Sequence, residues 1–226
     1  MARNLIAPAT VRKQVFLVED HPTFREGLAQ ILNGEPDLAV CGYASTAEEA
    51  LPAIARLVPD LALVDLSLPG KNGLELIKEL RQVNRKTKIL VVSMHDEALY
   101  ASRVLRAGGD GYIMKQEDTE DIIHAIRDVL AGRIHVSEEV MSSMPKTGTR
   151  APAKEKARPI DKLTDPELEV LELLGRGKDD REIARELQMT LAMVKICNAA
   201  LKKKLNLKSS NALLRYAVCW VETGSA

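Results

Sequence analysis

The sequence is poor in aromatic residues, in cysteines and in long apolar runs. Phe, Trp and Tyr make up 3% of the 226 residues, so aliphatic side chains must fill the core, and 46% apolar residues suffice for one. The three cysteines are too widely spaced for a disulfide framework or a zinc knuckle. No apolar run reaches the roughly 18 residues of a membrane span, and the N-terminus lacks the apolar stretch of a secretory signal. We therefore expect a cytoplasmic protein without membrane contact.

The chain also lacks an excess of charge of either sign. Its 32 basic and 32 acidic residues give a formal net charge of zero, so the whole-chain balance implies no polyanionic partner. The exception is local, because no acidic residue lies between Glu186 and Glu222, whereas five lysines and Arg215 do. This stretch predicts a basic surface on an otherwise neutral protein.

Between residues 14 and 136, short apolar runs alternate with longer segments of helical periodicity. The runs are VFLV, LAVCGY, LALV, ILVV and GYIM, each four to six residues long. Their aliphatic and β-branched side chains are typical of strands that are buried on both faces. Five strands alternating with helices predict an α/β fold, a doubly wound five-stranded parallel sheet.

Residues 137–160 break this alternation, and residues 161–226 follow a different pattern. The first stretch has three prolines and few large apolar residues, which favours a flexible linker over a surface loop of the first domain. The second stretch has the periodicity of four short helices. Two of these, over Asp180–Leu187 and Thr190–Leu205, are joined by a tight turn. This spacing predicts a small all-α, four-helix domain that contains a helix-turn-helix.

Charged and polar residues follow four of the five predicted strands. They are Glu19 and Asp20 after the first strand, Asp65 after the third, Ser93 after the fourth and Lys115 after the fifth. Ligands of open parallel sheets bind outside the carboxyl ends of the strands, so these side chains should share one rim. Clustered carboxylates need a divalent cation, and hard oxygen ligands suit Mg²⁺. A carboxylate beside that ion could attack a phosphoryl group, with Lys115 and Ser93 stabilising the transferred oxygens.

Each of these residues has a plainer interpretation when it is taken alone. An aspartate after an apolar strand is usually a polar strand end, and Lys115 alone would be a solvated charge. His21, beside the acidic pair, suggests a metal ligand, but no second His or Cys stands near it in the sequence. The combination of these positions at successive strand ends favours a phosphorylation site over the separate alternatives.

Four segments of this region resemble the receiver domain of bacterial two-component response regulators. They are VEDHPTFREGL, LALVDLSLPGKNGLEL, ILVVSMHDE and AGGDGYIMK. The resemblance covers about residues 14–133 and implies a flavodoxin-like fold with Asp65 as the phosphoacceptor. It implies that Ser93 is the switch hydroxyl, that Lys115 pairs with the phosphate and that Tyr112 is the aromatic residue that changes rotamer. The Mg²⁺ ligands that it implies are Glu19, Asp20, Asp65 and the backbone carbonyl of Ser67.

The predicted helix over residues 190–205 has an apolar and a basic face. The inner stripe consists of Val194, Cys197, Leu201 and Leu205. The opposite face carries Lys195, Asn198, Ala199 and Lys202, followed by Lys203 and Lys204. Such a face could enter the major groove of double-stranded DNA, where lysines would meet phosphates or guanine and Asn198 could read adenine. A solvated helix face is the alternative, which the lack of acidic residues disfavours.

Residues 163–221 resemble the LuxR-type DNA-binding domain, and with the receiver the chain resembles a NarL/FixJ-type response regulator. This resemblance places Lys195, Ile196 and Ala199 toward the groove. It implies a phosphorylation-controlled transcription regulator that forms a homodimer on paired half-sites. A histidine kinase is the expected phosphoryl donor, because the chain has no Gly-rich loop for ATP. We expect no enzyme activity apart from magnesium-dependent self-phosphorylation and dephosphorylation at Asp65.

Three residues depart from the LuxR-type pattern. Met193 stands in place of a threonine, Cys197 in place of a histidine and Ser210 in place of an arginine. A lost phosphate contact weakens DNA binding, so a phospho-switched protein-interaction module is the alternative function. Cys197 is expected to be a packed thiol rather than a redox sensor. A haloacid-dehalogenase-type phosphohydrolase is disfavoured, because Asp65 follows the third strand and no cap-sized insertion exists.

Overall fold

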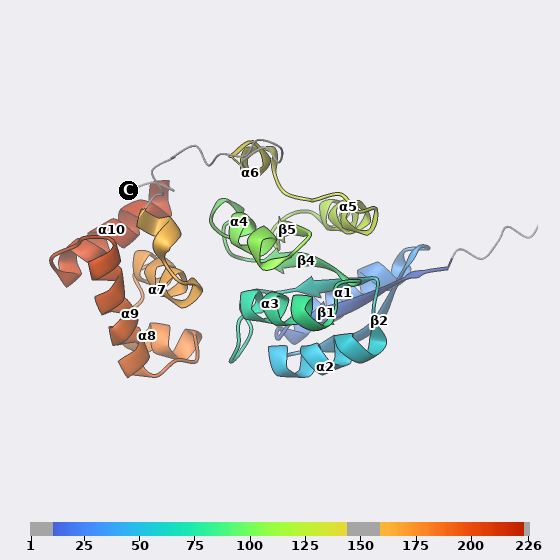
Figure 1. Cartoon of the computed structure of the whole chain (residues 1–226), viewed down its shortest axis with the longest axis horizontal. Coiled ribbons are helices and arrows are strands. Elements are labelled where there is room, and N and C mark those ends of the chain that lie inside the picture. The colour runs from blue at the N-terminus through green and yellow to red at the C-terminus, as the bar shows by residue number, and fades with distance from the viewer. Residues whose placement is uncertain (1–10, 144–158, 224–226) are drawn as a thin grey trace, which may run out of the picture. The chain divides into compact units, whose positions relative to one another are not determined.

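The computed structural model describes residues 11–143 and 159–223, which fall into two compact units divided at residues 145 and 146 (Figure 1). The N-terminal unit contains the sheet, and the C-terminal unit is helical. Within the described residues, no helix is long and apolar enough to cross a membrane.

The sheet of the N-terminal unit has five parallel strands. They are β1 (Lys13–Val18), β2 (Leu38–Ala44), β3 (Leu61–Val64), β4 (Lys88–Ser93) and β5 (Gly111–Met114). Their order across the sheet is β2-β1-β3-β4-β5. β2 lies on one side of β1 and β3 on the other, so the direction of progression across the sheet changes between β1 and β3. The carboxyl ends of these two strands therefore lie at the switch point where doubly wound folds bind ligands. The predicted fold is confirmed.

Helices cover both faces of the sheet. They are α1 (Pro22–Gly34), α2 (Ala47–Leu57), α3 (Gly73–Val83), α4 (Glu97–Ala107) and α5 (Thr119–Leu130). Alternate strand residues such as Leu17 and Leu63 form one core cluster with Leu32 of α1 and Ile126 of α5. On the other face, α2, α3 and α4 pack side by side. Both faces of each strand are therefore buried, which explains why the strands read as continuous apolar runs.

The start of the predicted linker is helical. Residues Glu138–Ser143 form α6, which contacts α4, and Val140 is only 4% exposed. The backbone N–H of Ser137 also donates a hydrogen bond to Glu97 Oε1 at 2.7 Å. These contacts attach the first residues of the expected linker to the N-terminal unit. Its remainder, residues 144–158, lies outside the described residues.

The described part of the C-terminal unit consists of short helices around an apolar core. They are the 3-10 helix η1 (Pro159–Lys162), α7 (Asp165–Gly175), α8 (Asp180–Glu186), α9 (Leu191–Lys204) and α10 (Ser210–Thr223). Between α8 and α9, Gln188 has a positive φ of 50°, and Thr190 Oγ1 accepts a hydrogen bond from the N–H of Met193 at 3.2 Å. The left-handed residue reverses the chain and the threonine caps α9, as a helix-turn-helix requires.

Candidate functional site

Lys115 lies between two buried carboxylates at the carboxyl ends of β1 and β3. Its Nζ is 2.7 Å from Glu19 Oε2 and 2.8 Å from Asp65 Oδ2. The side chains of these three residues are at most 7% exposed. Three residues that are far apart in the sequence thus form one ionic group, because the parallel strands deliver them to the same rim.

The ionic group shifts the proton affinities of its members. Burial, and then the charge of Asp65, raises the pKa of Glu19 against the opposing effect of Lys115. Burial alone would lower the pKa of Lys115, but the adjacent carboxylates outweigh it and the pKa is raised. Lys115 is therefore a fixed cation at neutral pH. A second cation would relieve the repulsion between Glu19 and Asp65 further.

Asp20 and His21 complete the acidic rim. Carboxylate oxygens of Glu19, Asp20 and Asp65 and a ring nitrogen of His21 lie within 4.8 Å of one another. Asp20 Oδ1 is buried and accepts no hydrogen bond, although His21 Nδ1 lies 2.8 Å away. A buried carboxylate oxygen without a donor fits a divalent cation. These acidic residues could hold Mg²⁺, as the sequence predicts.

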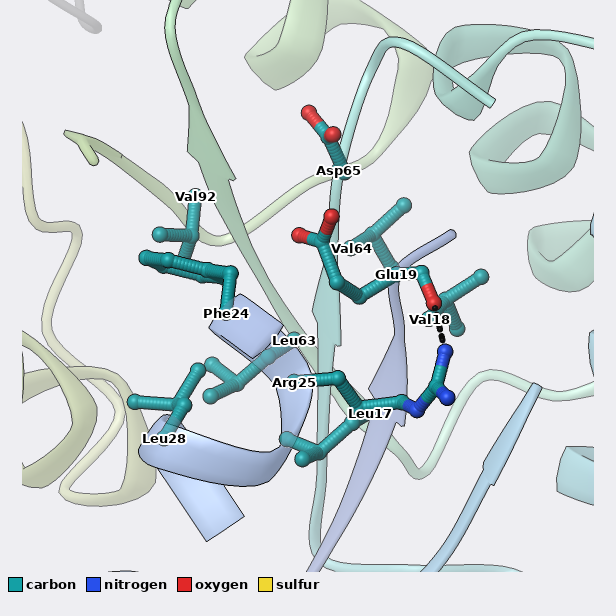
Figure 2. A pocket seen from close by; sticks show the side chains of 10 residues that line it. All are labelled: Leu17, Val18, Glu19, Phe24, Arg25, Leu28, Leu63, Val64, Asp65 and Val92. Carbon is teal, nitrogen blue, oxygen red and sulfur yellow. Dashed lines mark hydrogen bonds between the residues drawn. The ribbon is translucent and has the colours of Figure 1, made fainter. Parts of the chain in front are cut away.

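An apolar pocket lies below this rim. Figure 2 shows Glu19 and Asp65 beside the side chains of Leu17, Phe24, Leu28, Leu63 and Val92, which line it. Lys115 Nζ lies 4.6 Å from the centroid of the Phe24 ring. Arg25 Nη1 donates a hydrogen bond to the backbone oxygen of Glu19 at 2.9 Å, which fixes the end of β1. Apolar surroundings keep water away and strengthen the charge interactions above them.

A glycine sets the path of the chain after Asp65. The N–H of Gly73 donates a hydrogen bond to the backbone oxygen of Leu66 at 3.0 Å. A Cβ atom at residue 73 would lie 2.2 Å from the backbone oxygen of Asp65. Only glycine permits α3 to begin this close to the strand end that carries Asp65.

The helix α9 presents an apolar and an exposed face, as its periodicity predicts. Val194 and Leu201 are fully buried and Leu205 is 8% exposed. The exposed residues include Lys195, Ile196, Ala199 and Lys203. Ile196 is 68% exposed, although it is a large apolar residue. Small and basic side chains on the surface of a helix that follows a tight turn are suited to entering a DNA groove.

The comparisons with known proteins agree with both parts of this geometry. Residues 15–127 match the family model of the response regulator receiver domain, and residues 161–217 match that of bacterial regulatory proteins of the luxR family. The chain is a two-component response regulator. The nitrate/nitrite response regulator protein NarL of Escherichia coli K12 is 35% identical to it over 204 residues, which are 89% of this chain and 91% of NarL.

Solved structures of response regulators share the fold. A LuxR-family two-component response regulator from Aurantimonas sp. SI85-9A1 is 34% identical, with a TM-score of 0.55 over 58% of this chain and 94% of that chain. RcsB from Salmonella enterica serovar Typhimurium, bound to promoter rprA in the presence of BeF3-, has a TM-score of 0.62 over 92% of this chain and 98% of that chain. Because its sequence identity is only 23%, this match shows a shared fold and nothing further. The matches place this response regulator in the NarL/FixJ type, a phospho-regulated DNA-binding transcription regulator rather than a member of a catalytic enzyme family.

The structure brings the predicted switch residues of the response regulator together through His95. Ser93 and Tyr112 are buried, at 0% and 1% exposure. Tyr112 donates its hydroxyl hydrogen to the backbone oxygen of His95 at 2.8 Å, and the N–H of His95 donates to Ser93 Oγ at 3.4 Å. His95 Nε2 also lies 3.0 Å from Oγ of Ser67, whose own N–H donates to Asp65 Oδ1 at 3.2 Å.

His95 was missed by the sequence prediction. The available signal was its position two residues after Ser93, which matches the position of Ser67 two residues after Asp65. β3 and β4 are neighbours in the sheet, so the loops that carry Ser67 and His95 leave it side by side. That spacing could have placed Ser67 and His95 on facing loops, but it does not by itself show that they meet.

Asn198, on the predicted outer face of α9, has a partner inside the C-terminal unit. Its amide Nδ2 donates a hydrogen bond to Asp180 Oδ1 of α8 at 2.9 Å, and the residue is half-buried. The side chain is thus engaged by α8 within the unit, and its reading of adenine stays a prediction. Residue 198 lies at the border of the outer face, where α8 packs against α9 and captures its side chain.

Two of the predicted DNA-contacting lysines also have partners inside the C-terminal unit. Lys204 Nζ lies 2.6 Å from Glu167 Oε2 of α7, and Lys202 Nζ lies 3.3 Å from Ser210 Oγ at the start of α10. Lys203 has an exposed side chain between them.

Cys197 is half-buried, and burial followed by the charge of Glu167 raises the pKa of its thiol. A protonated, half-buried thiol agrees with a packing role.

Proposed function

We propose that Asp65 of this response regulator accepts a phosphoryl group from a partner histidine kinase in the cytoplasm. An Asp65 oxygen forms the new bond to phosphorus, the bond from phosphorus to the donor nitrogen breaks, and its electron pair stays with the donor. The observation that supports this proposal is the buried ionic group of Lys115, Glu19 and Asp65. It holds a carboxylate beside a cation at the switch point of the sheet.

The residues that would hold Mg²⁺ are Glu19, Asp20, Asp65 and the backbone carbonyl of Ser67. When bound, the ion neutralises negative charge on the phosphoryl oxygens. Lys115 pairs with those oxygens once Asp65 is modified, because its Nζ already touches Asp65 Oδ2. Ser93 donates a hydrogen bond to the phosphorylated Asp65. Tyr112 and His95 change position when Ser93 moves to make this bond. Ser67, His95, Ser93 and Tyr112 already lie in one hydrogen-bonded network that reaches Asp65.

The phosphorylated receiver then controls double-stranded DNA binding by α9, in a homodimer. Lys195 and Lys203 supply phosphate or guanine contacts, and Ile196 and Ala199 face the groove. Lys204 and Asn198 contribute indirectly, because their contacts with Glu167 and Asp180 hold α9 against α7 and α8. The luxR-family match over residues 161–217 supports this assignment.

A phospho-switched protein-interaction module is the second candidate function. It is favoured by three exposed apolar residues at the start of α9, namely Leu191, Met193 and Ile196. Apolar side chains in this position are more typical of protein contacts than of phosphate contacts.

Two measurements on the full chain test the first proposal. Incubation with a small-molecule phosphoryl donor and Mg²⁺ should give an acid-stable, base-labile phosphoryl group on the wild type and none on Asp65→Asn. Binding to duplex DNA, followed by fluorescence anisotropy at several salt concentrations, should weaken steeply with salt. Lys195→Ala and Lys203→Ala should each reduce the salt slope by about 1, whereas Lys86→Ala, an exposed lysine of the receiver, should not. Phosphorylation without DNA binding would instead favour the interaction module.

A further inference from the structure

Two histidines and an aspartate form a second cluster of possible metal ligands, at the end of the sheet opposite to Asp65. His124 and Asp128 are one turn apart on α5, and His135 follows the helix. One ligand atom from each residue lies within 4.8 Å of the others. His135 pairs with Gly111, the first residue of β5, whereas Asp65 follows the last residue of β3. The cluster is therefore separate from the phosphorylation site.

The backbone of His135 is fixed on the sheet. Its oxygen accepts a hydrogen bond from the N–H of Tyr112 at 2.8 Å, and its N–H donates to the oxygen of Asp110 at 3.3 Å. Between α5 and His135 the chain turns at Gly132, whose φ is 84°. A ligand from the sheet edge and two ligands from one helix face are thus held on rigid elements, as a preorganised metal site requires.

The distances between the ligand atoms are close to the edge of a small coordination polyhedron. Asp128 Oδ2 lies 3.1 Å from His135 Nδ1 and 3.5 Å from His124 Nδ1. Zinc binds nitrogen and oxygen ligands at about 2.0–2.2 Å, which places neighbouring ligands of a tetrahedron about 3.3–3.6 Å apart. The distance to His124 falls within this range, and the distance to His135 is slightly shorter. We propose that His124, Asp128 and His135 form a binding site for a transition-metal ion of the Zn²⁺ class.

The ligand types select this class of ion. Imidazole nitrogens suit Zn²⁺, Co²⁺, Ni²⁺ and Cu²⁺, whereas Mg²⁺ prefers oxygen ligands. Two imidazoles and one carboxylate leave a fourth position for water, since the side chain of His124 is 72% exposed. The acidic rim around Asp65, rich in carboxylates, has the opposite preference. One receiver domain would then bind two ions of different chemistry at opposite ends of its sheet.

Arg133 is the competing cation at this site. Its Nε lies 3.1 Å from Asp128 Oδ1, and its Nη2 contacts the same oxygen. The hydrogen bond from Arg133, opposed by burial, lowers the pKa of Asp128, so the carboxylate is ionised at neutral pH. Arg133 occupies Oδ1 and leaves Oδ2 to the histidines. Its side chain is 64% exposed, so it can move aside without unfolding its surroundings.

The test uses the full chain with Mg²⁺ in large excess, so that the acidic rim is occupied by a hard cation. Co²⁺ is the optical probe, and Zn²⁺ displaces it. We expect visible d–d absorption of a four-coordinate ion without a thiolate charge-transfer band, which excludes the three cysteines as ligands. His124→Ala should weaken Co²⁺ binding at least about tenfold, since even outer-shell partners of a metal contribute this much. Arg133→Gln should strengthen binding, because it removes the competing charge.

Glu75→Gln is the control, because Glu75 is an exposed carboxylate of α3 that belongs to neither cluster. It should leave Co²⁺ affinity unchanged, whereas His21→Ala reports any Co²⁺ that binds at the acidic rim instead. Circular dichroism of His124→Ala, whose side chain is largely exposed, checks that the fold is intact. The proposal fails if the wild type does not bind Co²⁺, if a thiolate band appears, or if His21→Ala rather than His124→Ala removes binding.

Discussion

Ser67 Oγ lies 3.0 Å from His95 Nε2, so the loops that follow β3 and β4 are joined beside Asp65. Ser67 is at the same time tied to Asp65 Oδ1 through its backbone N–H. The imidazole ring of His95 also packs against the Tyr100 ring, with centroids 4.7 Å apart. The backbone oxygen of His95 accepts a hydrogen bond from the Tyr112 hydroxyl. The phosphoacceptor candidate and the aromatic residues of the receiver are therefore coupled through one histidine.

The first prediction concerns the lifetime of the phosphoryl group. His95→Ala should accelerate its loss from Asp65, because the side-chain bridge that joins the two loops beside Asp65 is removed. A single neutral hydrogen bond contributes about 1 kcal/mol, or roughly a fivefold change in rate. The measurement is the decay of the base-labile phosphoryl signal after removal of the donor.

The coupled partner provides the control for this change. Ser67→Ala should have a similar effect, and the double variant should decay no faster than either single variant. Strictly additive effects of the two substitutions would show that the hydrogen bond between Ser67 and His95 does not control the decay.

The second prediction concerns the start of α3. Gly73→Ala should destabilise the N-terminal unit by about 1–3 kcal/mol, as overpacking does, because the new Cβ meets the backbone oxygen of Asp65. Phosphorylation should also slow, since the end of β3 must move. Gly27→Ala, in the interior of α1 where a Cβ meets no atom within 4 Å, should instead stabilise the unit by about 0.5–1 kcal/mol. Urea unfolding monitored by circular dichroism separates the two outcomes.

The third prediction separates positioning from DNA contact on α9. Asn198→Ala removes the hydrogen bond to Asp180 and should cost about 1 kcal/mol of stability in the C-terminal unit. Lys203→Ala should leave stability within about 0.5 kcal/mol, while DNA affinity falls. Thermal unfolding and anisotropy on the same two variants test this. If Asn198→Ala kept full stability and altered base preference at one operator position, the residue would be a base reader after all.

The fourth prediction concerns acid stability. Arg127 Nη2 lies 2.8 Å from Asp37 Oδ1, and this interaction lowers the pKa of Asp37 from its ordinary value of 3.8. A lowered carboxyl pKa stabilises the fold above the ordinary value, and the contribution disappears as the pH falls through the folded-state pKa. Arg127→Met should therefore destabilise the protein at neutral pH and approach the wild type in acid.

The size of this effect is limited by solvent. The Arg127 and Asp37 side chains are 43% and 38% exposed, so the contribution should stay below about 1 kcal/mol and shrink in high salt. Urea unfolding across the acid range, with and without added salt, gives the measurement. An equal loss of stability at every pH would point to the lost packing of the arginine stem instead.

The sequence by itself determined the alternation of strands and helices, the helical second unit and the rim that joins Glu19, Asp65 and Lys115. Strand ends can be read locally, and the parallel arrangement brings every carboxyl end to the same edge. The apolar stripe of α9 could likewise be predicted, because a period of 3.6 residues fixes which side faces the core.

Only the tertiary structure decided which partner each border residue takes. Asn198 turns inward because Asp180 of α8 offers an acceptor, and Lys204 is held by Glu167, 37 residues earlier in the chain. Helical periodicity defines a face but not the neighbour that packs at its border. The meeting of His135 with Asp128 has the same origin, since it depends on the turn at Gly132 and the pairing of His135 with β5. Such contacts depend on packing between distant segments of the chain, so they cannot be predicted from a local sequence pattern.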